Sequence, residues 1–209
     1  MAAQRKVFVV VRLYLLRHGE TRYNRENLGL GRADIELTEV GKNQSELAAD
    51  SLQEVVFDMI YSSPLSRAAY LANLVAREGN RTVQRVDALM EMDVGKTEGM
   101  KLSDVRDMFP IFIKEWSGPN KIHAAMPGGE SLTDIEVRVE SVLDDLKSYK
   151  EGNIAIIAHN FVLRILICKI LGLSVTAFNS FVLDLASITI MEMIPYPHIL
   201  RLNDTCHLR

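Results

Sequence analysis

Cysteine is scarce in this sequence. The 209 residues contain two cysteines, Cys168 and Cys206, which stand far apart. Such a pair gives no disulfide framework, and a chain of this length can bury a full core without one. Cys168 lies in an apolar helical run, where a free thiol behaves as a small hydrophobic side chain. We therefore expect a reducing, cytoplasmic setting.

Long apolar runs are also missing. The most apolar stretch, residues 161–171, is too short to cross a bilayer core of about 30 Å. Near the amino terminus Arg5 and Lys6 precede the run "VFVVV", but Arg12 interrupts it and no small-residue cleavage site follows. We interpret this segment as a strand and not as a signal peptide. The sequence thus predicts no membrane segment.

No Lys/Arg-rich tract is present either. Lys and Arg total 24 against 27 Asp and Glu, which gives a formal net charge of -3. This excludes the basic footprint of a nucleic-acid-binding protein, so an anionic ligand would have to be held by a local pocket. Repeats, low-complexity segments and Gly/Pro-rich linkers are absent as well. We expect residues 1–209 to form one domain.

What the chain does contain is a regular alternation of strand and helix patterns. Short β-branched runs predict strands at residues 7–16, 55–61, 82–86 and 154–158. Helical periodicity predicts helices over residues 38–52, from Ser63-Pro64 onward, over 131–149 with a capping box at Ser131 and Asp134, and over 160–171. The runs near Ala186 and Ile199 predict late edge strands. This alternation predicts an α/β fold: a three-layer α/β/α sandwich with a largely parallel central sheet.

Unusual polar residues follow the predicted strands. Arg17 and His18 end the first strand, Arg67 comes shortly after the second, and His159 ends the fourth. Glu91 follows the third. Because ligands of parallel α/β sheets bind beyond the carboxyl ends of the strands, we expect these five side chains to meet at one rim.

This set of residue types suits phosphoryl transfer. Two arginines offer permanently charged donor forks, and helix amino termini add N–H donors for a compact dianion. A neutral histidine can attack phosphorus to give a phosphohistidine, while Glu91 protonates the leaving alkoxide and later accepts a proton from water. The scheme requires no metal ion or cofactor.

Each residue alone also has an ordinary explanation. An Arg-His pair in a loop is usually solvated or capping, Arg67 alone fits a surface position on an amphipathic helix, and Glu91 alone fits a helix cap. A histidine that ends an apolar strand, as His159 does, is less ordinary. The joint placement at strand ends is what favours a site.

The motifs around these residues resemble one family. "LLRHGETRYN" is similar to the signature of the histidine phosphatase superfamily, also called the phosphoglycerate mutase-like family. The resemblance continues in family order through almost the whole chain, in "GRADIELTEVGKNQ", "YSSPLSRAAYLA", "EMDVGKTEG", "PGGES" and "IAHNFVLRILICKILGL".

The resemblance implies His18 as the phosphorylated nucleophile and Glu91 as the proton donor. It also implies that Arg17, Arg67 and His159 bind the phosphoryl group together with Asn24, for which a turn or capping role is an equal alternative. The chain departs from the family where Asn160 follows the second histidine in place of a common glycine. It departs again at Leu30, which predicts a less polar substrate rim, and at Thr97.

The family includes both phosphatases and cofactor-dependent mutases. The sequence after Glu91 carries no basic insertion and the tail is short, so we favour a phosphatase of a small phosphate ester over a phosphoglycerate mutase. A non-catalytic phosphate-binding protein is the third alternative. Residues 101–126 are predicted to form a small helical cap, in which Met108, Phe109, Phe112, Trp116 and His123 mostly pack in the core. A homodimer is possible, and the sequence does not name the substrate.

Overall fold

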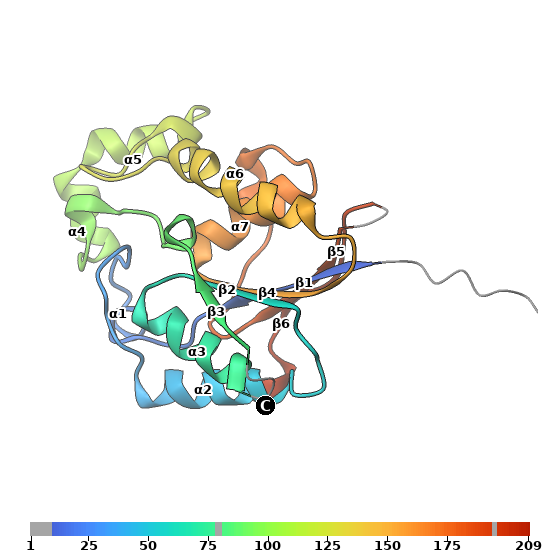
Figure 1. Ribbon diagram of the computed structural model, residues 1–209. Helices are drawn as coiled ribbons and strands as arrows, with labels where there is room; N and C mark the ends of the chain where they lie inside the picture. The colour runs from blue at the N-terminus through green and yellow to red at the C-terminus, as the bar shows by residue number, and fades with distance from the viewer. Residues whose placement is uncertain (1–9, 78–80, 194–195) are drawn as a thin grey trace, which may run out of the picture.

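The computed structural model describes residues 10–77, 81–193 and 196–209. At its centre lies a six-stranded sheet of order β3-β2-β4-β1-β5-β6 (Figure 1). The first four strands in this order are parallel, whereas β5 and β6 are antiparallel to their neighbours. The strands are β1 (Val11–Arg17), β2 (Met59–Ser62), β3 (Val83–Arg85), β4 (Gly152–Ala158), β5 (Ile188–Glu192) and β6 (His198–Asp204). The predicted α/β class and largely parallel sheet are confirmed.

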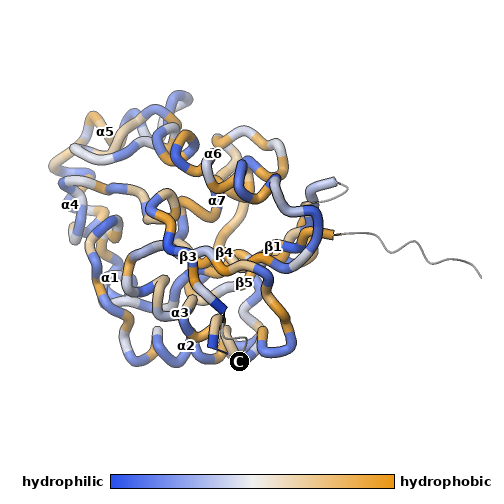
Figure 2. The backbone as a smooth tube through the Cα atoms, in the orientation of Figure 1, coloured by the Kyte–Doolittle hydropathy of each residue, from blue (hydrophilic) through white to orange (hydrophobic). Residues whose placement is uncertain are grey.

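Helices cover both faces of the sheet (Figure 1). The covering helices are α2 (Glu39–Asp50) and α3 (Ser66–Arg77) on one face, and α6 (Leu132–Ser148) and α7 (Asn160–Ile170) on the other. Successive β1 side chains point to opposite faces, so Leu13 and Leu15 pack with α6 and α7 while Tyr14 and Leu16 pack with α2 and α3. Figure 2 shows the apolar strands between helices of mixed hydropathy. The predicted three layers are therefore present.

Side-chain caps set the starts of two predicted helices. The Thr38 hydroxyl accepts from the Gly41 N–H at 3.0 Å and begins α2. Ser131 and Asp134 form the predicted capping box of α6. After the carboxyl end of α7, Gly172 takes a left-handed φ of 68°, a conformation that glycine adopts without steric cost.

Two predicted boundaries and one predicted strand position are wrong. The strand predicted for 55–61 begins only at Met59, since a turn precedes it and Val56 is 66% exposed. The helix predicted from Ser63-Pro64 begins at Ser66, because the Ser63 N–H still bonds to β4 through the Ile157 carbonyl. Of the two late strands only β6 is an edge strand, since β5 lies between β1 and β6. Residues 7–9 of the first predicted strand lie outside the described residues.

The segment 101–126 is helical and lies beside the carboxyl ends of the parallel strands, next to α1 (Figure 1). Its elements are α4 (Leu102–Met108), α5 (Pro110–Trp116) and η3 (Lys121–His123). Phe112 is buried and Trp116 partly buried, as predicted, but Met108 is 64% exposed and His123 is also exposed, so neither belongs to the core. The remaining short elements are α1 (Arg22–Arg25), η1 (Asp87–Leu89), η2 (Gly95–Thr97), η4 (Val175–Ser180) and η5 (Cys206–Leu208).

Within the described ranges, no helix combines the length and the apolar character needed to cross a membrane.

Candidate active site

The two histidines of the candidate site are brought together by strand register. β1 and β4 pair in parallel with Arg17 opposite Ala158, so His18 and His159 follow neighbouring strand ends. Their ring centroids lie 5.1 Å apart with the planes tilted by 57°. The sheet therefore fixes this pair before any helix contributes to the site.

His18 is held in one tautomer. It is 2% exposed, and burial, with the positive charges of Arg67 and Arg17, holds its pKa well below the ordinary value. Its Nδ1 lies 2.7 Å from the Gly19 carbonyl oxygen. Because a carbonyl oxygen only accepts, the hydrogen of the neutral ring must be on Nδ1. The lone pair is then on Nε2, as a nucleophile requires.

Arg67 is the second residue of α3 and is completely buried, which rules out the surface position. Its Nη1 donates to the Ala33 carbonyl at 2.7 Å and its Nη2 to the Gly31 carbonyl at 2.6 Å. Glu98 holds the same loop from its other side, because its carboxylate accepts from the N–H groups of Gly31 and Ala33 at 2.9 and 3.1 Å. The guanidinium is thereby fixed by backbone carbonyls on two of its three nitrogens.

Arg17 and His159 are each held by a hydrogen bond at one side-chain nitrogen. Arg17 Nη1 donates to the Leu183 carbonyl at 2.6 Å. His159 Nε2 lies 2.8 Å from the Ser63 hydroxyl. When that hydroxyl donates to Nε2, the neutral imidazole carries its hydrogen on Nδ1.

Unsatisfied donors gather among these residues. In the described ranges, four buried side-chain atoms lack a hydrogen-bond partner, and three of them are Arg17 Nε, Arg67 Nε and His159 Nδ1; the fourth is Ser66 Oγ. A buried polar atom without a partner costs about 1–3 kcal/mol, so it calls for an explanation. A bound anion would supply acceptor oxygens for nitrogens of this kind.

Glu91 lies on the α7 side of the site and is 4% exposed. Its Oε1 accepts from the Met92 N–H at 2.9 Å, and the Phe161 N–H at the start of α7 donates to both carboxyl oxygens at 3.2 and 3.3 Å. Burial raises the pKa of Glu91, while the Met92 N–H and the charges of Arg67 and Arg17 oppose that rise. A carboxyl group with a raised pKa is suited to donate a proton.

Asn24 occupies the capping position that was one of its two predicted roles. Its Oδ1 accepts from the Thr21 N–H at 3.1 Å and from the Thr21 hydroxyl at 2.8 Å, which forms a capping box at α1. The cap fixes the amide oxygen and leaves the amide nitrogen as a donor. Asn24 and Arg17 both line an open hollow of about 660 Å³. Capping and phosphate binding are therefore compatible.

The departures from the family pattern have simple local settings. Asn160 is the first residue of α7, outside the left-handed region, and the N–H that reaches Glu91 belongs to the next residue, Phe161. Thr97 is buried, and its hydroxyl donates to the Val94 carbonyl at 2.8 Å. Leu30 is half-buried, and its effect on the substrate rim stays a prediction.

Gly19 is required by the close approach of another backbone segment. A Cβ at Gly19 would lie 2.2 Å from the Gly41 carbonyl oxygen, far inside van der Waals contact. Glycine is required here because the first turn of α2 approaches the chain directly after His18. The same contact explains Gly41, where a Cβ would lie 2.0 Å from the Glu20 carbonyl oxygen.

Several supporting residues were not assigned from the sequence. Ser63 holds His159, Glu98 holds the loop under Arg67, and Arg138 donates to the Glu91 carbonyl oxygen at 3.2 Å. Glu98 stands inside a family-like motif, which was an available signal. Arg138 lies within the polar positions of a helical pattern and carries no such signal.

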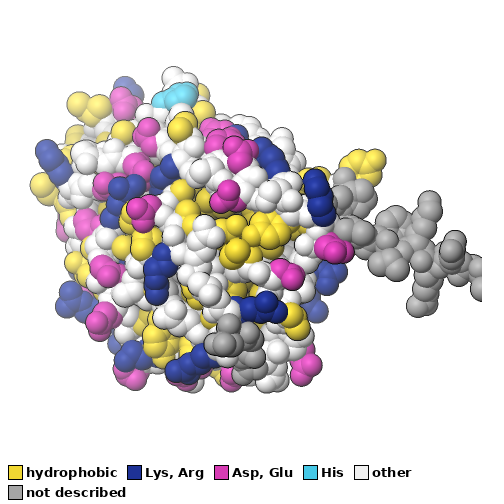
Figure 3. Space-filling model, viewed as in Figure 1, with side chains coloured by type: hydrophobic (Ala, Val, Ile, Leu, Met, Phe, Trp, Pro, Cys, Tyr) yellow, Lys and Arg dark blue, Asp and Glu magenta, His cyan; other side chains and the backbone are white. Residues whose placement is uncertain are grey.

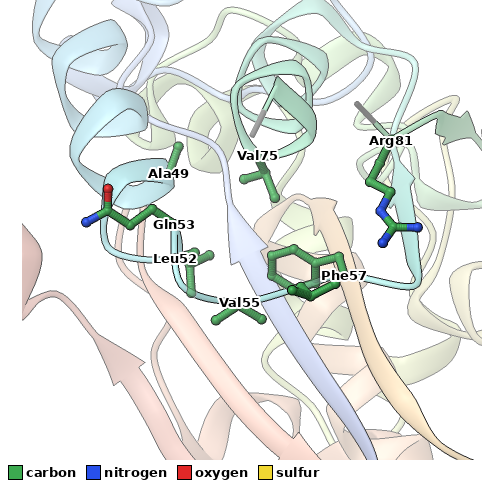
Figure 4. A pocket seen from close by; sticks show the side chains of 8 residues that line it. Ala49, Leu52, Gln53, Val55, Phe57, Val75 and Arg81 are labelled. Atoms are coloured by element: carbon green, nitrogen blue, oxygen red, sulfur yellow. The ribbon is translucent and has the colours of Figure 1, made fainter. Parts of the chain in front are cut away.

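Within the described residues there is also a cavity away from the candidate site, but no group of side chains placed to hold a metal ion. A cavity of about 80 Å³ lies between α2, α3 and the segment before β2, away from the strand ends (Figure 4). It is lined mainly by apolar side chains: Ala49, Leu52, Gln53, Val55, Val56, Phe57, Val75 and Arg81. No three His, Cys, Asp or Glu side chains in the described part of the chain lie together as they would to hold a metal ion.

Known proteins share this arrangement of strands and motifs. The model of the histidine phosphatase superfamily (branch 1) matches residues 13–205. The chain is 34% identical over 202 residues to phosphoserine phosphatase 1 of Hydrogenobacter thermophilus, with 95% of each chain covered. It is 33% identical over 178 residues to a 2,3-bisphosphoglycerate-dependent phosphoglycerate mutase of Mesorhizobium japonicum, covering 78% of this chain and 82% of that one.

A solved structure extends the likeness to three dimensions. The α-ribazole phosphatase of Shigella flexneri superposes with a TM-score of 0.84 at 30% identity, over 92% of this chain and 96% of that one. The family model alone covers far more than half of the residues. The chain therefore belongs to branch 1 of the histidine phosphatase superfamily.

Proposed function

We propose that this chain is a phosphomonoesterase that hydrolyses a small phosphorylated metabolite through a phosphohistidine on His18. One observation carries the proposal: the neutral, buried His18 packs beside His159 and is exposed to the charges of Arg17 and Arg67, and each of these three residues has a buried side-chain nitrogen without a hydrogen-bond partner. These donors suit the oxygens of a phosphoryl group, and Asn24 adds its amide nitrogen at the edge. Membership of the histidine phosphatase superfamily, with relatives that are named phosphatases, supports the same class of reaction.

In the first step, His18 Nε2 attacks phosphorus and the bond from phosphorus to the ester oxygen breaks. Glu91 gives its proton to the departing oxygen, so an alcohol leaves instead of an alkoxide. Charge on the transferring phosphoryl group is neutralised by the two guanidinium groups, and His18 Nδ1 keeps its hydrogen and donates it to the Gly19 carbonyl oxygen throughout.

In the second step, the Glu91 carboxylate takes a proton from a water molecule whose oxygen attacks phosphorus. The bond from phosphorus to Nε2 breaks, inorganic phosphate leaves, and both His18 and Glu91 return to their starting protonation states. Burial raises the pKa of Glu91, which favours its protonated form for the next cycle.

For the substrate, we propose an alkyl phosphate of metabolite size, with phosphoserine as the first compound to test. Relatives that cover nearly the whole chain are named for phosphoserine, and a similar solved structure for α-ribazole phosphate. The leaving group of such an ester would lie beside Glu91, which protonates it. We further propose that residues 101–126 act as a cap on a single domain, where they select that leaving group.

The proposal extends to the setting of the enzyme. We propose that it acts in the cytoplasm, without a metal ion and without binding nucleic acid. Figure 3 shows basic and acidic side chains intermingled on the face it draws, which fits the net charge of -3. A homodimer is proposed as well, and light scattering during size-exclusion chromatography tests it.

The decisive experiment compares His18→Asn with His198→Asn, since His198 is an exposed histidine of β6. We expect wild type and His198→Asn to release phosphate from phosphoserine and 4-nitrophenyl phosphate and to form an acid-labile phosphoenzyme. His18→Asn should show neither activity nor labelling. Phosphate binding without turnover by the wild type would support the non-catalytic alternative, and conversion of 3-phosphoglycerate to 2-phosphoglycerate would support the mutase.

A further inference from the structure

One arginine of α6 holds the backbone of the segment that carries Glu91. Arg138, in the middle of α6, donates from Nη1 to the Ala88 carbonyl at 2.5 Å and from Nη2 to the Glu91 carbonyl at 3.2 Å. Its fork thus spans the turn from η1 to the candidate acid. A single side chain therefore holds two backbone oxygens of this segment, those of Ala88 and Glu91.

Glu130 completes the arrangement. Its Oε1 accepts from Arg138 Nε at 3.0 Å, and its Oε2 accepts from Arg138 Nη2 at 3.2 Å and from the Asp93 N–H at 2.9 Å. The side chains of Arg138 and Glu130 are 17% and 16% exposed, so solvent competes little for these bonds. The ion pair therefore clamps residues 88–93 at two carbonyls and one N–H.

We propose that Arg138, held by Glu130, is a positioning residue for the general acid: it sets where the Glu91 carboxyl stands relative to His18. The proposal rests on the proposed function, in which Glu91 protonates the leaving group. Nothing in that function assigns Arg138 or Glu130 a role. Arg138 does not touch the candidate phosphate-binding atoms and acts through the backbone of Glu91.

The effect is one of geometry more than of charge. The positive charge of Arg138 is paired with Glu130, and Arg32 adds a second contact to that carboxylate at 2.8 Å. The charges that act on the pKa of Glu91 are those of Arg67 and Arg17. Loss of the clamp should displace the acid without changing the binding of the phosphoryl group.

This distinction gives a measurable signature. Proton donation matters most for a poor leaving group, such as the serine alkoxide released from phosphoserine. It matters little for the stable phenolate released from 2,4-dinitrophenyl phosphate. A displaced acid therefore lowers kcat/KM for the alkyl ester selectively. Generally damaged folding lowers both values together. Since kcat/KM includes the step in which the leaving group departs, later dephosphorylation does not mask the effect.

The experiment measures kcat/KM for both esters in Arg138→Gln, Arg138→Lys and Glu130→Gln. We expect Arg138→Gln to lose about tenfold or more on phosphoserine and less than about threefold on the dinitrophenyl ester, because small misplacements of catalytic groups have large costs. Arg138→Lys keeps the charge but not the fork, so it should lose an intermediate amount. Inhibition by inorganic phosphate should be unchanged in all three.

Lys169→Gln is the matched control. Lys169 forms a comparable, partly buried ion pair with Glu136 and Glu140 of α6 but contacts no part of the 88–93 segment. It should leave both rates as in the wild type, and melting temperatures should identify any variant that is not folded. If Arg138→Gln fails to fold, Arg138→Lys and Glu130→Gln carry the test.

Glu91→Gln separates the positioning role of Arg138 from the acid role of Glu91. A selective loss on phosphoserine in Glu91→Gln supports the acid role, and its absence overturns the proposed role of Glu91 itself. If Glu91→Gln is selective while folded Arg138 and Glu130 variants lose equal factors on both esters, or lose nothing, the positioning role is overturned and the proposed function stands.

Discussion

The strand-end site and the helical segment 101–126 beside it are attached to the protein in different ways. In the site, backbone groups fix the functional side chains: carbonyls hold Arg67, and N–H groups hold Glu91. The segment instead meets the body through aromatic side chains, with the Trp116 ring 6.1 Å from Phe161 and 6.4 Å from Phe178. Hydrogen bonds join the segment to its surroundings near its ends, as between Met126 and Glu130.

This difference suggests a division of work. Backbone atoms cannot be exchanged by substitution, so a side chain that they hold directly, such as Arg67, keeps its geometry while nearby side chains vary. Aromatic contacts depend on particular side chains and can be repacked. We therefore expect chemistry to reside in the first region and choice of leaving group in the second.

The largest expected effect tests the fixed region. Arg67→Lys cannot satisfy both loop carbonyls and also reach a phosphoryl oxygen, so kcat/KM should fall by about 10²- to 10³-fold, as when one charge-stabilising donor is removed. The loss should be similar for every phosphate ester. Steady-state kinetics on alkyl and aryl phosphates measure it.

Arg77→Lys is its control, since Arg77 is an exposed residue in the last turn of the same helix. A loss in Arg67→Lys that depended strongly on the leaving group would break the proposed division, because it would give the fixed region a part in selecting the substrate.

A smaller effect concerns pH. The first step requires neutral His18 and protonated Glu91, whose pKa values are lowered and raised respectively. Activity on phosphoserine should therefore persist on the acid side, where His18 stays neutral. Above the raised pKa of Glu91, kcat/KM should fall up to about tenfold per pH unit as the acid loses its proton.

Comparison of pH profiles for wild type and Glu91→Gln removes the contribution of substrate ionisation, which both share. The variant should lack the alkaline decline that belongs to Glu91. An identical decline in both proteins would mean that the limiting group is not Glu91.

The smallest effect is expected in the segment 101–126. Trp116→Leu should change KM for a bulky ester by roughly tenfold or less, as changes in apolar pocket contacts do, and should leave kcat for a small aryl phosphate unchanged. A panel of esters of increasing size measures this. The exposed Ile111, replaced by serine, serves as the control. A uniform loss of kcat in Trp116→Leu would show that this segment also shapes the chemical step, through its contact with Phe161.

Much of this arrangement could be predicted from local sequence. Strand-like runs that end in Arg17 and His159 were sufficient to place both residues at one rim, because parallel strands end on the same side. Ser131 and Asp134 correctly predicted the start of α6, since capping is a local interaction. The start of α3 predicted from Pro64 is wrong by two residues. Ser63 still pairs with β4 through its backbone, and such pairing is not a local property of the sequence.

The sequence by itself determined the class of fold and the residue types available to the candidate site, because periodicity and residue type are properties of the sequence. Tertiary structure alone decided how those groups are tuned. The tautomer of His18, the free Nε atoms of Arg17 and Arg67, and the clamp of Arg138 on the Glu91 segment depend on contacts between residues far apart in sequence. Burial and hydrogen-bond direction are properties of the packed molecule, so they exist only after the chain has folded.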